Sequence, residues 1–155
     1  MLEYNVAAGT VNPDTGKTYG TSGSASLTIE NTANNVSLEN ITVANTFDYP
    51  NETIEGKMAV AMLTRADKLI FNNVRLTGWQ DTLQADGGNR QYFRNCYIEG
   101  NVDWIFGSAQ AVFDDCDIVA NGDGYVTAAS TESTRLTGYV FILSLIHISE
   151  PTRPY

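Results

Sequence analysis

Two aspartates, Asp81 and Asp103, stand 22 residues apart, and each lies between two apolar segments. The flanking apolar residues Phe71 and Phe93 keep the same interval. In a stack of parallel coils this interval places both carboxyl groups on one face, about 5 Å apart. Two carboxyl groups that close do not both ionise readily, so the pair is expected to titrate as a unit with one member protonated. Such a pair would supply an acid and a nucleophile side by side.

Three neighbouring side chains extend this interpretation. Gln80 would add an uncharged hydrogen-bond donor of the kind that stabilises an oxyanion. Trp79 and Trp104 flank the aspartates and are placed to stack on sugar rings, although their position fits the protein core equally well. Spacing alone also leaves open a structural acidic patch with no catalytic role.

The remaining composition disfavours several other functions. The single histidine, His147, lies outside the repeat described below, which argues against a Ser-His-Asp or Cys-His site. No group of residues has zinc-ligand spacing, and ADGGN (85–89) indicates a turn and not a phosphate loop. The formal net charge of -9 argues against a nucleic acid or an anionic membrane as partner. The apolar run YVFILSLI (139–146) is far shorter than the roughly 20 residues that span a bilayer.

An internal repeat predicts the fold. Each copy carries a large apolar residue, then Asn or Asp two positions later, then apolar residues that alternate with polar ones: SLENITVAN (37–45), IFNNVRLTG (70–78), YFRNCYIEG (92–100) and VFDDCDIVA (112–120). A second strand is expected in each copy: AVAML (59–63), DTLQA (81–85), WIFGS (104–108) and YVTAA (125–129). Short strands that recur about every 20 residues, without helical periodicity, predict an all-β fold, a right-handed parallel β-helix.

Stacking of these coils places like residues on like. The recurrent polar residues are expected to form a hydrogen-bonded ladder at a turn: Asn40, Asn73, Asn95 and Asp115. Cys96 and Cys116 occupy the same slot on successive coils, either as buried thiols or as a disulfide. The segment TFDYPNETIEGK (46–57) is predicted to be an inserted surface loop.

The motif WQDTL (79–83), followed by YFRNCYIEGNVDWIFG (92–107), resembles the signature of the pectin methylesterase family of parallel β-helix esterases. The resemblance implies that Asp103 is the nucleophile that attacks the C6 methyl-ester carbonyl of a galacturonate residue. It implies that Asp81 is first the general acid and then the base, and that Gln80 donates to the oxyanion. It further implies pectin as the substrate, no metal or organic cofactor, a monomer, and a secreted, periplasmic or extracellular location.

Two departures from the family pattern predict weakened catalysis. The family's second oxyanion glutamine is replaced by Met58, whose thioether cannot donate a hydrogen bond. The downstream motif that supplies an Arg beside the nucleophile and a Trp in the groove has no counterpart here. The tail SLIHISEPTRPY (144–155) resembles a translated sequencing adapter and is expected to be non-native. Residues 1–143 are accordingly interpreted as part of a truncated pectinesterase domain.

Other classes of protein remain open at this point. Met58 also fits a catalytically silent β-helix that binds polysaccharide. Polygalacturonases and pectate lyases share the solenoid fold, and glycosidases use carboxylate pairs of similar spacing. Release of methanol, cleavage of the polymer and dependence on calcium would separate these alternatives.

Overall fold

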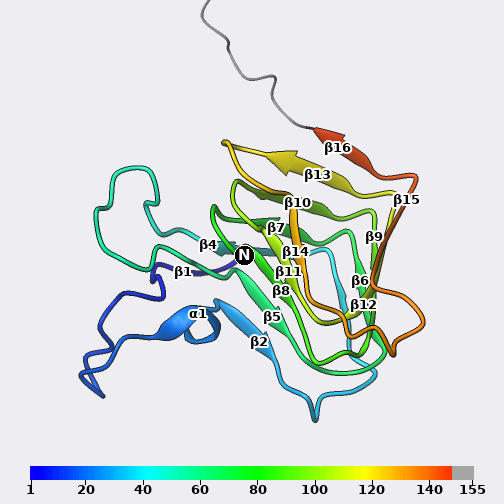
Figure 1. Cartoon of the computed structure of the whole chain (residues 1–155), viewed down its shortest axis with the longest axis horizontal. Helices are drawn as coiled ribbons and strands as arrows, with labels where there is room; N and C mark the ends of the chain where they lie inside the picture. Colours follow the sequence, from blue (N-terminus) through cyan, green and yellow to red (C-terminus); the bar gives the residue numbers. More distant parts are fainter. Residues whose placement is uncertain (148–155) are drawn as a thin grey trace, which may run out of the picture.

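Short strands with one apolar face bury that face only by stacking, and here they stack in parallel. The computed structural model describes residues 1–147 as a right-handed parallel β-helix with three sheets (Figure 1). The β1 sheet contains β1 (Leu2–Tyr4), β4 (Thr42–Asn45), β7 (Arg75–Thr77), β10 (Tyr97–Gly100), β13 (Asp117–Ala120) and β16 (Leu145–His147). The β2 sheet contains β2 (Leu27–Ile29), β5 (Met62–Thr64), β8 (Leu83–Ala85), β11 (Ile105–Gly107) and β14 (Thr127–Ala129). The β3 sheet contains β3 (Ser37–Glu39), β6 (Leu69–Asn72), β9 (Arg90–Arg94), β12 (Gln110–Asp114) and β15 (Tyr139–Ile142).

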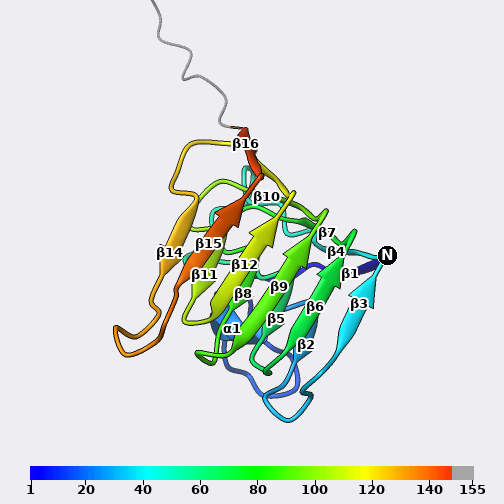
Figure 2. The same ribbon diagram turned by 90° about the vertical axis from the view of Figure 1, so that its right-hand side faces the viewer.

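Each coil contributes one strand to each sheet, in the order β2 sheet, β3 sheet, β1 sheet. Figure 2 shows the parallel strands of the β3 sheet side by side. Phe71 pairs with Phe93, and Leu76 pairs with Ile98, so the predicted 22-residue register is confirmed on two sheets. The strand predicted over 81–85 is shorter than expected, because Asp81 and the residue after it belong to the preceding turn.

Tight corners join each strand of the β3 sheet to the next strand of the β1 sheet. The recurrent residue at these corners has a left-handed backbone: Asn40 (φ 55°), Asn73 (φ 52°), Asn95 (φ 51°), Asp115 (φ 53°) and Leu143 (φ 51°). Asn and Asp tolerate this conformation because their short polar side chains bond locally. Asn73 Nδ2 donates to Asn40 Oδ1 at 2.7 Å, which confirms the predicted contact between coils for this pair.

A ladder of phenylalanines fills the interior. The rings of Phe71 and Phe93 are stacked with centroids 4.5 Å apart, and those of Phe93 and Phe113 are 4.8 Å apart. Phe141 continues the stack at 4.8 Å from Phe113. The first three of these rings are fully buried. Each ring therefore packs against the ring of the preceding coil, and the stack joins the successive coils.

The structure also describes the cysteines, the inserted loop and part of the tail that were singled out from the sequence. Cys96 and Cys116 are buried free thiols on neighbouring coils. The inserted loop 46–57 leaves the solenoid after β4 and contains no strand. Strand β16 pairs with β13, so the ladder continues past the predicted domain boundary at residue 143. The rest of the predicted non-native tail, residues 148–155, lies outside the described residues.

In the described part of the chain, helical structure is confined to one turn, α1 (Gly20–Gly23), in the segment that connects β1 to β2. Among residues 1–147, no helix has the length and apolarity needed to cross a bilayer.

The phenylalanine ladder predicts a large loss of stability from a single truncation. Phe93→Ala should lower the free energy of unfolding by about 3 to 5 kcal/mol, because the ring is lost between two others. Urea denaturation checks this value. Ile70→Ala is the matched control, since Ile70 lies on the outer face of the same sheet and is 47% exposed. Equal losses in the two variants would contradict a core built on the ladder.

Candidate active site

Asp81 and Asp103 lie in equivalent corners between the β1 sheet and the β2 sheet. The backbone N–H of Asp81 donates to the Val102 carbonyl at 3.0 Å. One coil earlier, the Ala59 N–H donates to the Gln80 carbonyl at 3.1 Å. Residues 59, 81 and 103 are therefore in register on three successive coils, as the sequence interval predicted.

The two aspartates also share an unusual backbone conformation. Asp81 has φ 66° and Asp103 has φ 48°, both in the left-handed region. The two residues are close enough for the charge of Asp103 to act on Asp81. The next coil follows at about 4.8 Å. The two aspartates are therefore separated by a single coil spacing.

Burial makes Asp81 the more perturbed of the two carboxyl groups. Asp81 is 8% exposed, whereas Asp103 is half-buried. Burial, and secondly the charge of Asp103, raise the pKa of Asp81 to about 7. A carboxyl group with such a pKa can hold a proton near neutral pH and also give it up. That is the property required of a group that acts first as an acid and then as a base.

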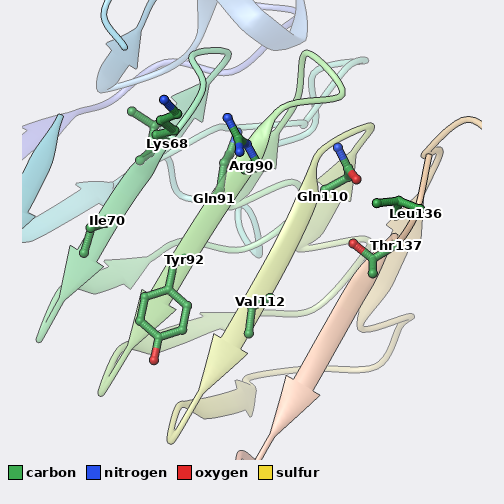
Figure 3. A pocket seen from close by; sticks show the side chains of 10 residues that line it. Lys68, Ile70, Arg90, Gln91, Tyr92, Gln110, Val112, Leu136 and Thr137 are labelled. Atoms are coloured by element: carbon green, nitrogen blue, oxygen red, sulfur yellow. The ribbon is translucent and has the colours of Figure 1, made fainter. Parts of the chain in front are cut away.

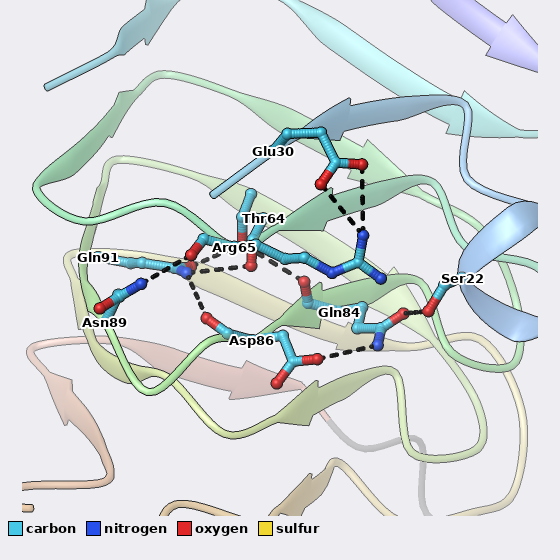
Figure 4. A network of polar contacts seen from close by, with 8 residues as sticks. All are labelled: Ser22, Glu30, Thr64, Arg65, Gln84, Asp86, Asn89 and Gln91. Carbon is cyan, nitrogen blue, oxygen red and sulfur yellow. Dashed lines mark hydrogen bonds and ion pairs between the residues drawn. The ribbon is translucent and has the colours of Figure 1, made fainter. Parts of the chain in front are cut away.

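Asp86, a few residues further along the chain, has the opposite electrostatics. Burial raises its pKa, but hydrogen bonds from Ser108, from backbone N–H groups and from Gln84 outweigh this effect, and the net pKa is lowered. Gln84 in turn accepts a hydrogen bond from Ser22 Oγ at 3.0 Å (Figure 4). This network ties the α1 segment to the outer face of the β2 sheet. Asp86 therefore has a structural role that Asp81 lacks.

A second part of the same network closes the neighbouring corner. Thr64 Oγ1 donates to Gln91 Oε1 at 2.7 Å, and Asn89 Nδ2 donates to the Arg65 carbonyl at 2.8 Å (Figure 4). The Arg65 side chain forms an ion pair with Glu30 at 3.4 Å. These polar groups are therefore engaged in contacts that join neighbouring coils.

Gln80 and Met58 occupy matching positions on adjacent coils, each next to the in-register pair Asp81 and Ala59. Both side chains are half-buried. The amide of Gln80 can donate to an oxygen that develops negative charge beside the aspartates, whereas the thioether of Met58 cannot. Of these two matched positions, only Gln80 carries a side chain that can donate such a hydrogen bond.

The structure separates the two tryptophans. Trp79 is half-buried and its ring stacks on Tyr49, with centroids 6.0 Å apart and planes 10° from parallel. Trp104 is 1% exposed and packs against Gly100 in the solenoid interior. The expectation that Trp104 stacks on a sugar ring is corrected: its ring belongs to the core, where its Nε1 has no hydrogen-bond partner among the described residues.

Two aromatic residues near the corner were not singled out from the sequence. Tyr49 lies in the loop 46–57, which projects beside the corner in Figure 1, and it covers one face of Trp79. Phe106 follows the buried Ile105 on β11, so strand alternation turns it outward, three residues after Asp103. The alternation in WIFG was a usable signal for Phe106. No local signal indicates that Tyr49 would meet Trp79.

A shallow apolar groove lies elsewhere, on the outer face of the β3 sheet. Its floor is the in-register row Ile70, Tyr92 and Val112, and Leu136 rises at one end (Figure 3). None of the predicted site residues lines it. Within residues 1–147, no group of three or more His, Cys, Asp or Glu side chains is placed to hold a metal ion. The paired aspartates remain the best candidate for chemistry.

Comparison with known families gives a consistent match. The family model described as "Pectinesterase" matches residues 5–154. "Probable pectinesterase A" of Aspergillus flavus is 45% identical over 117 residues, covering 76% of this chain and 34% of that protein. "Pectinesterase 31" of Arabidopsis thaliana is 42% identical over 106 residues, covering 67% of this chain and 33% of that protein. The chain thus spans about a third of the length of these relatives.

Solved structures show the same fold. A pectin methylesterase from Yersinia enterocolitica superimposes with a TM-score of 0.88 at 40% identity, covering 96% of this chain and 51% of that one. A pectin methylesterase in complex with a hexasaccharide gives a TM-score of 0.86 at 35% identity, covering 96% of this chain and 48% of that one. These neighbours confirm the predicted parallel β-helix.

The raised pKa of Asp81 predicts a stability that falls as pH rises. In the unfolded chain this carboxyl group returns to its ordinary pKa of 3.8, so above that pH the unfolded state loses its proton first. Stability should decline between about pH 4 and about pH 7, and the full cost should remain at pH 8. Asp81→Asn removes this cost and should raise the free energy of unfolding at pH 8 by up to about 4 kcal/mol.

Urea denaturation at pH 8 and pH 4 measures the effect. The gain from Asp81→Asn should vanish at pH 4, because wild-type Asp81 is then protonated in the folded state. The exposed Asp14 provides the control, and Asp14→Asn should change stability little at either pH. A gain from Asp81→Asn that is equal at both pH values would show that the side chain's charge is not what costs stability.

Proposed function

The chain belongs to the pectinesterase family, and on that premise we propose that it removes methyl esters from the C6 carboxyl groups of galacturonate in pectin. The observation that carries this proposal is the pair Asp81 and Asp103, in register on adjacent coils, with the pKa of Asp81 raised to about 7. A relative of known structure that binds a hexasaccharide supports a pectin-derived oligosaccharide as the ligand.

The first half of the proposed reaction forms an acyl-enzyme. The carboxylate of Asp103 attacks the ester carbonyl carbon, and the carbonyl oxygen takes up negative charge. The side-chain amide of Gln80 donates a hydrogen bond to that oxygen. As the C–O bond to the methoxy group breaks, Asp81 gives its proton to the departing oxygen, and methanol leaves.

The second half restores the enzyme. Asp81, now ionised, accepts a proton from a water molecule as that water attacks the acyl carbon. The bond to Asp103 breaks, the free galacturonate carboxyl group is released, and both aspartates return to their starting states. A pKa of Asp81 near 7 suits both proton transfers, since neither state of the group is strongly favoured at neutral pH.

The proposed function also implies a location and a set of partners for the protein. An enzyme that acts on pectin works where the polymer is found, so we expect a secreted, periplasmic or extracellular location. We also predict that the protein is a monomer, that it has no nucleic-acid or membrane partner, and that it needs no cofactor. The second candidate function is a catalytically silent pectin-binding β-helix, which the thioether at Met58 favours.

Methanol release from methyl-esterified pectin tests the aspartate roles. Asp103→Asn and Asp81→Asn should each lower the rate by about 10³-fold or more, because one removes the nucleophile and the other the proton donor. Asp14→Asn, a charge change of the same kind at an exposed site, should leave the rate unchanged. Pectin binding without methanol release by the unsubstituted chain would favour the silent binder.

Met58→Gln should raise the rate of methanol release. Loss of one oxyanion donor typically costs about 2.7 to 4 kcal/mol of barrier, so restoring it should increase turnover by roughly 10²-fold or more. Met58→Leu is the matched control, since leucine fills similar space without a donor and should leave the rate near that of the starting chain. A glutamine variant no faster than the leucine variant would contradict the assigned position of the second donor.

A further inference from the structure

Two solvent-accessible tyrosines in the first part of the chain touch through their hydroxyl groups. Tyr4 lies on β1 and is 40% exposed, and the half-buried Tyr19 directly precedes α1. Their hydroxyl oxygens are 2.9 Å apart and share a hydrogen bond. The ring centroids are 6.1 Å apart with planes at 86°, which is an edge-to-face contact. The fold therefore brings together two phenols that are 15 residues apart in the chain.

The other tyrosines of residues 1–147 are engaged differently. Three of them donate their hydroxyl group to a carboxylate or to a main-chain carbonyl: Tyr92, Tyr97 and Tyr139. The Tyr49 ring stacks on Trp79, and Tyr125 is 77% exposed. Within this range, Tyr4 and Tyr19 form the one pair of tyrosines that contact each other.

This pair lies where the solenoid is held by few strand contacts. Within residues 1–147, β1 is at the edge of its sheet and pairs with β4 alone. The segment between the two tyrosines lies outside the strands of the solenoid (Figure 1) and folds on itself through an antiparallel bridge between Val11 and Thr18. Edge strands and surface segments of this kind open more readily than interior strands. A bond between the two rings would close this segment and fasten β1.

We propose that Tyr4 and Tyr19 are the site of an oxidative cross-link, a dityrosine bond that fastens β1 and is formed with hydrogen peroxide as the oxidant. Each phenol loses one electron and its hydroxyl proton. The two tyrosyl radicals then join through the ring carbons next to their oxygens, and the hydrogens on those carbons move to the oxygens. Both rings thereby regain their hydroxyl groups. Hydrogen peroxide accepts the two electrons and two protons and leaves as two molecules of water.

Contact in the folded protein selects this pair for the reaction. Tyrosyl radicals couple only where their rings meet, and a pair already held in contact reacts as if each partner were highly concentrated. The carbons that join are each two bonds away from the hydrogen-bonded oxygens of Tyr4 and Tyr19. A rotation of two solvent-accessible side chains brings these carbons together. The bond within one chain should therefore form in preference to bonds between chains, including those through the exposed Tyr125.

Treatment of the folded chain with a haem peroxidase and hydrogen peroxide tests the proposal. At low protein concentration the chain should stay monomeric on a denaturing gel, lose the mass of two hydrogen atoms and gain the fluorescence of dityrosine. Proteolytic digestion and mass spectrometry should then recover one pair of peptides joined at Tyr4 and Tyr19.

Amide hydrogen exchange measures whether the bond fastens β1. The Thr46 N–H donates to the Tyr4 carbonyl at 2.8 Å, so it exchanges when β1 detaches from the sheet. Exchange at Thr46 should slow roughly tenfold or more in the cross-linked chain, because the bond closes a loop between positions 15 residues apart.

Three variants locate the bond. Tyr4→Phe and Tyr19→Phe each keep the ring but lack the hydroxyl group, so neither should form the cross-link. Tyr125→Phe removes an exposed tyrosine without a tyrosine partner in residues 1–147, and it should leave the cross-link unchanged. The proposal is overturned if the starting chain forms no bond within one molecule, if the bond persists in Tyr4→Phe or Tyr19→Phe, or if exchange at Thr46 is the same with and without it.

Discussion

Backbone hydrogen bonds between successive coils are the constraint on which the rest of this molecule depends. They hold each residue directly over its counterpart, so a position in one coil determines the neighbours of the same position in the next. Equivalent residues of successive coils are related by a translation along the solenoid axis. This relation accounts for the phenylalanine stack, the asparagine contact and the aspartate pair. The repeat itself brings Asp81 and Asp103 onto adjacent coils.

The electrostatic surroundings of the aspartates differ from one point of this regular arrangement to another. Asp86 is buried in part, yet donors surround it and stabilise its charged form. Asp81 is more deeply buried and has another carboxyl group as its neighbour. The charged form of the same residue type is thus stabilised at Asp86 and disfavoured at Asp81, five residues away. The difference lies in the hydrogen-bond donors that the adjacent strands supply, and not in the aspartates themselves.

The sequence predicted well whatever repeats with the coil. The register of Phe71 with Phe93, the turns at the recurrent Asn and Asp residues, and the alignment of Asp81 with Asp103 all follow from a repeated spacing. It predicted poorly what breaks the repeat. The inward direction of Trp104 was hidden because Trp104 precedes β11, so the alternation of that strand does not determine its direction. The contact between Tyr49 and Trp79 joins a loop without periodicity to a distant corner, so no local pattern could indicate it.

The corners of the solenoid differ in how much variation in length they accept. The corner between the β3 sheet and the β1 sheet always takes two residues, as at 40–41, 73–74 and 95–96. The corner that carries the aspartates is short at 78–82 but holds the long excursion 46–61 one coil earlier. Insertions that would shift the phenylalanine ladder are therefore absent from the first corner in the described residues, whereas the corner that carries the aspartates accepts a longer loop. Such a scaffold can exchange the loops around this corner with no change to the coils beneath.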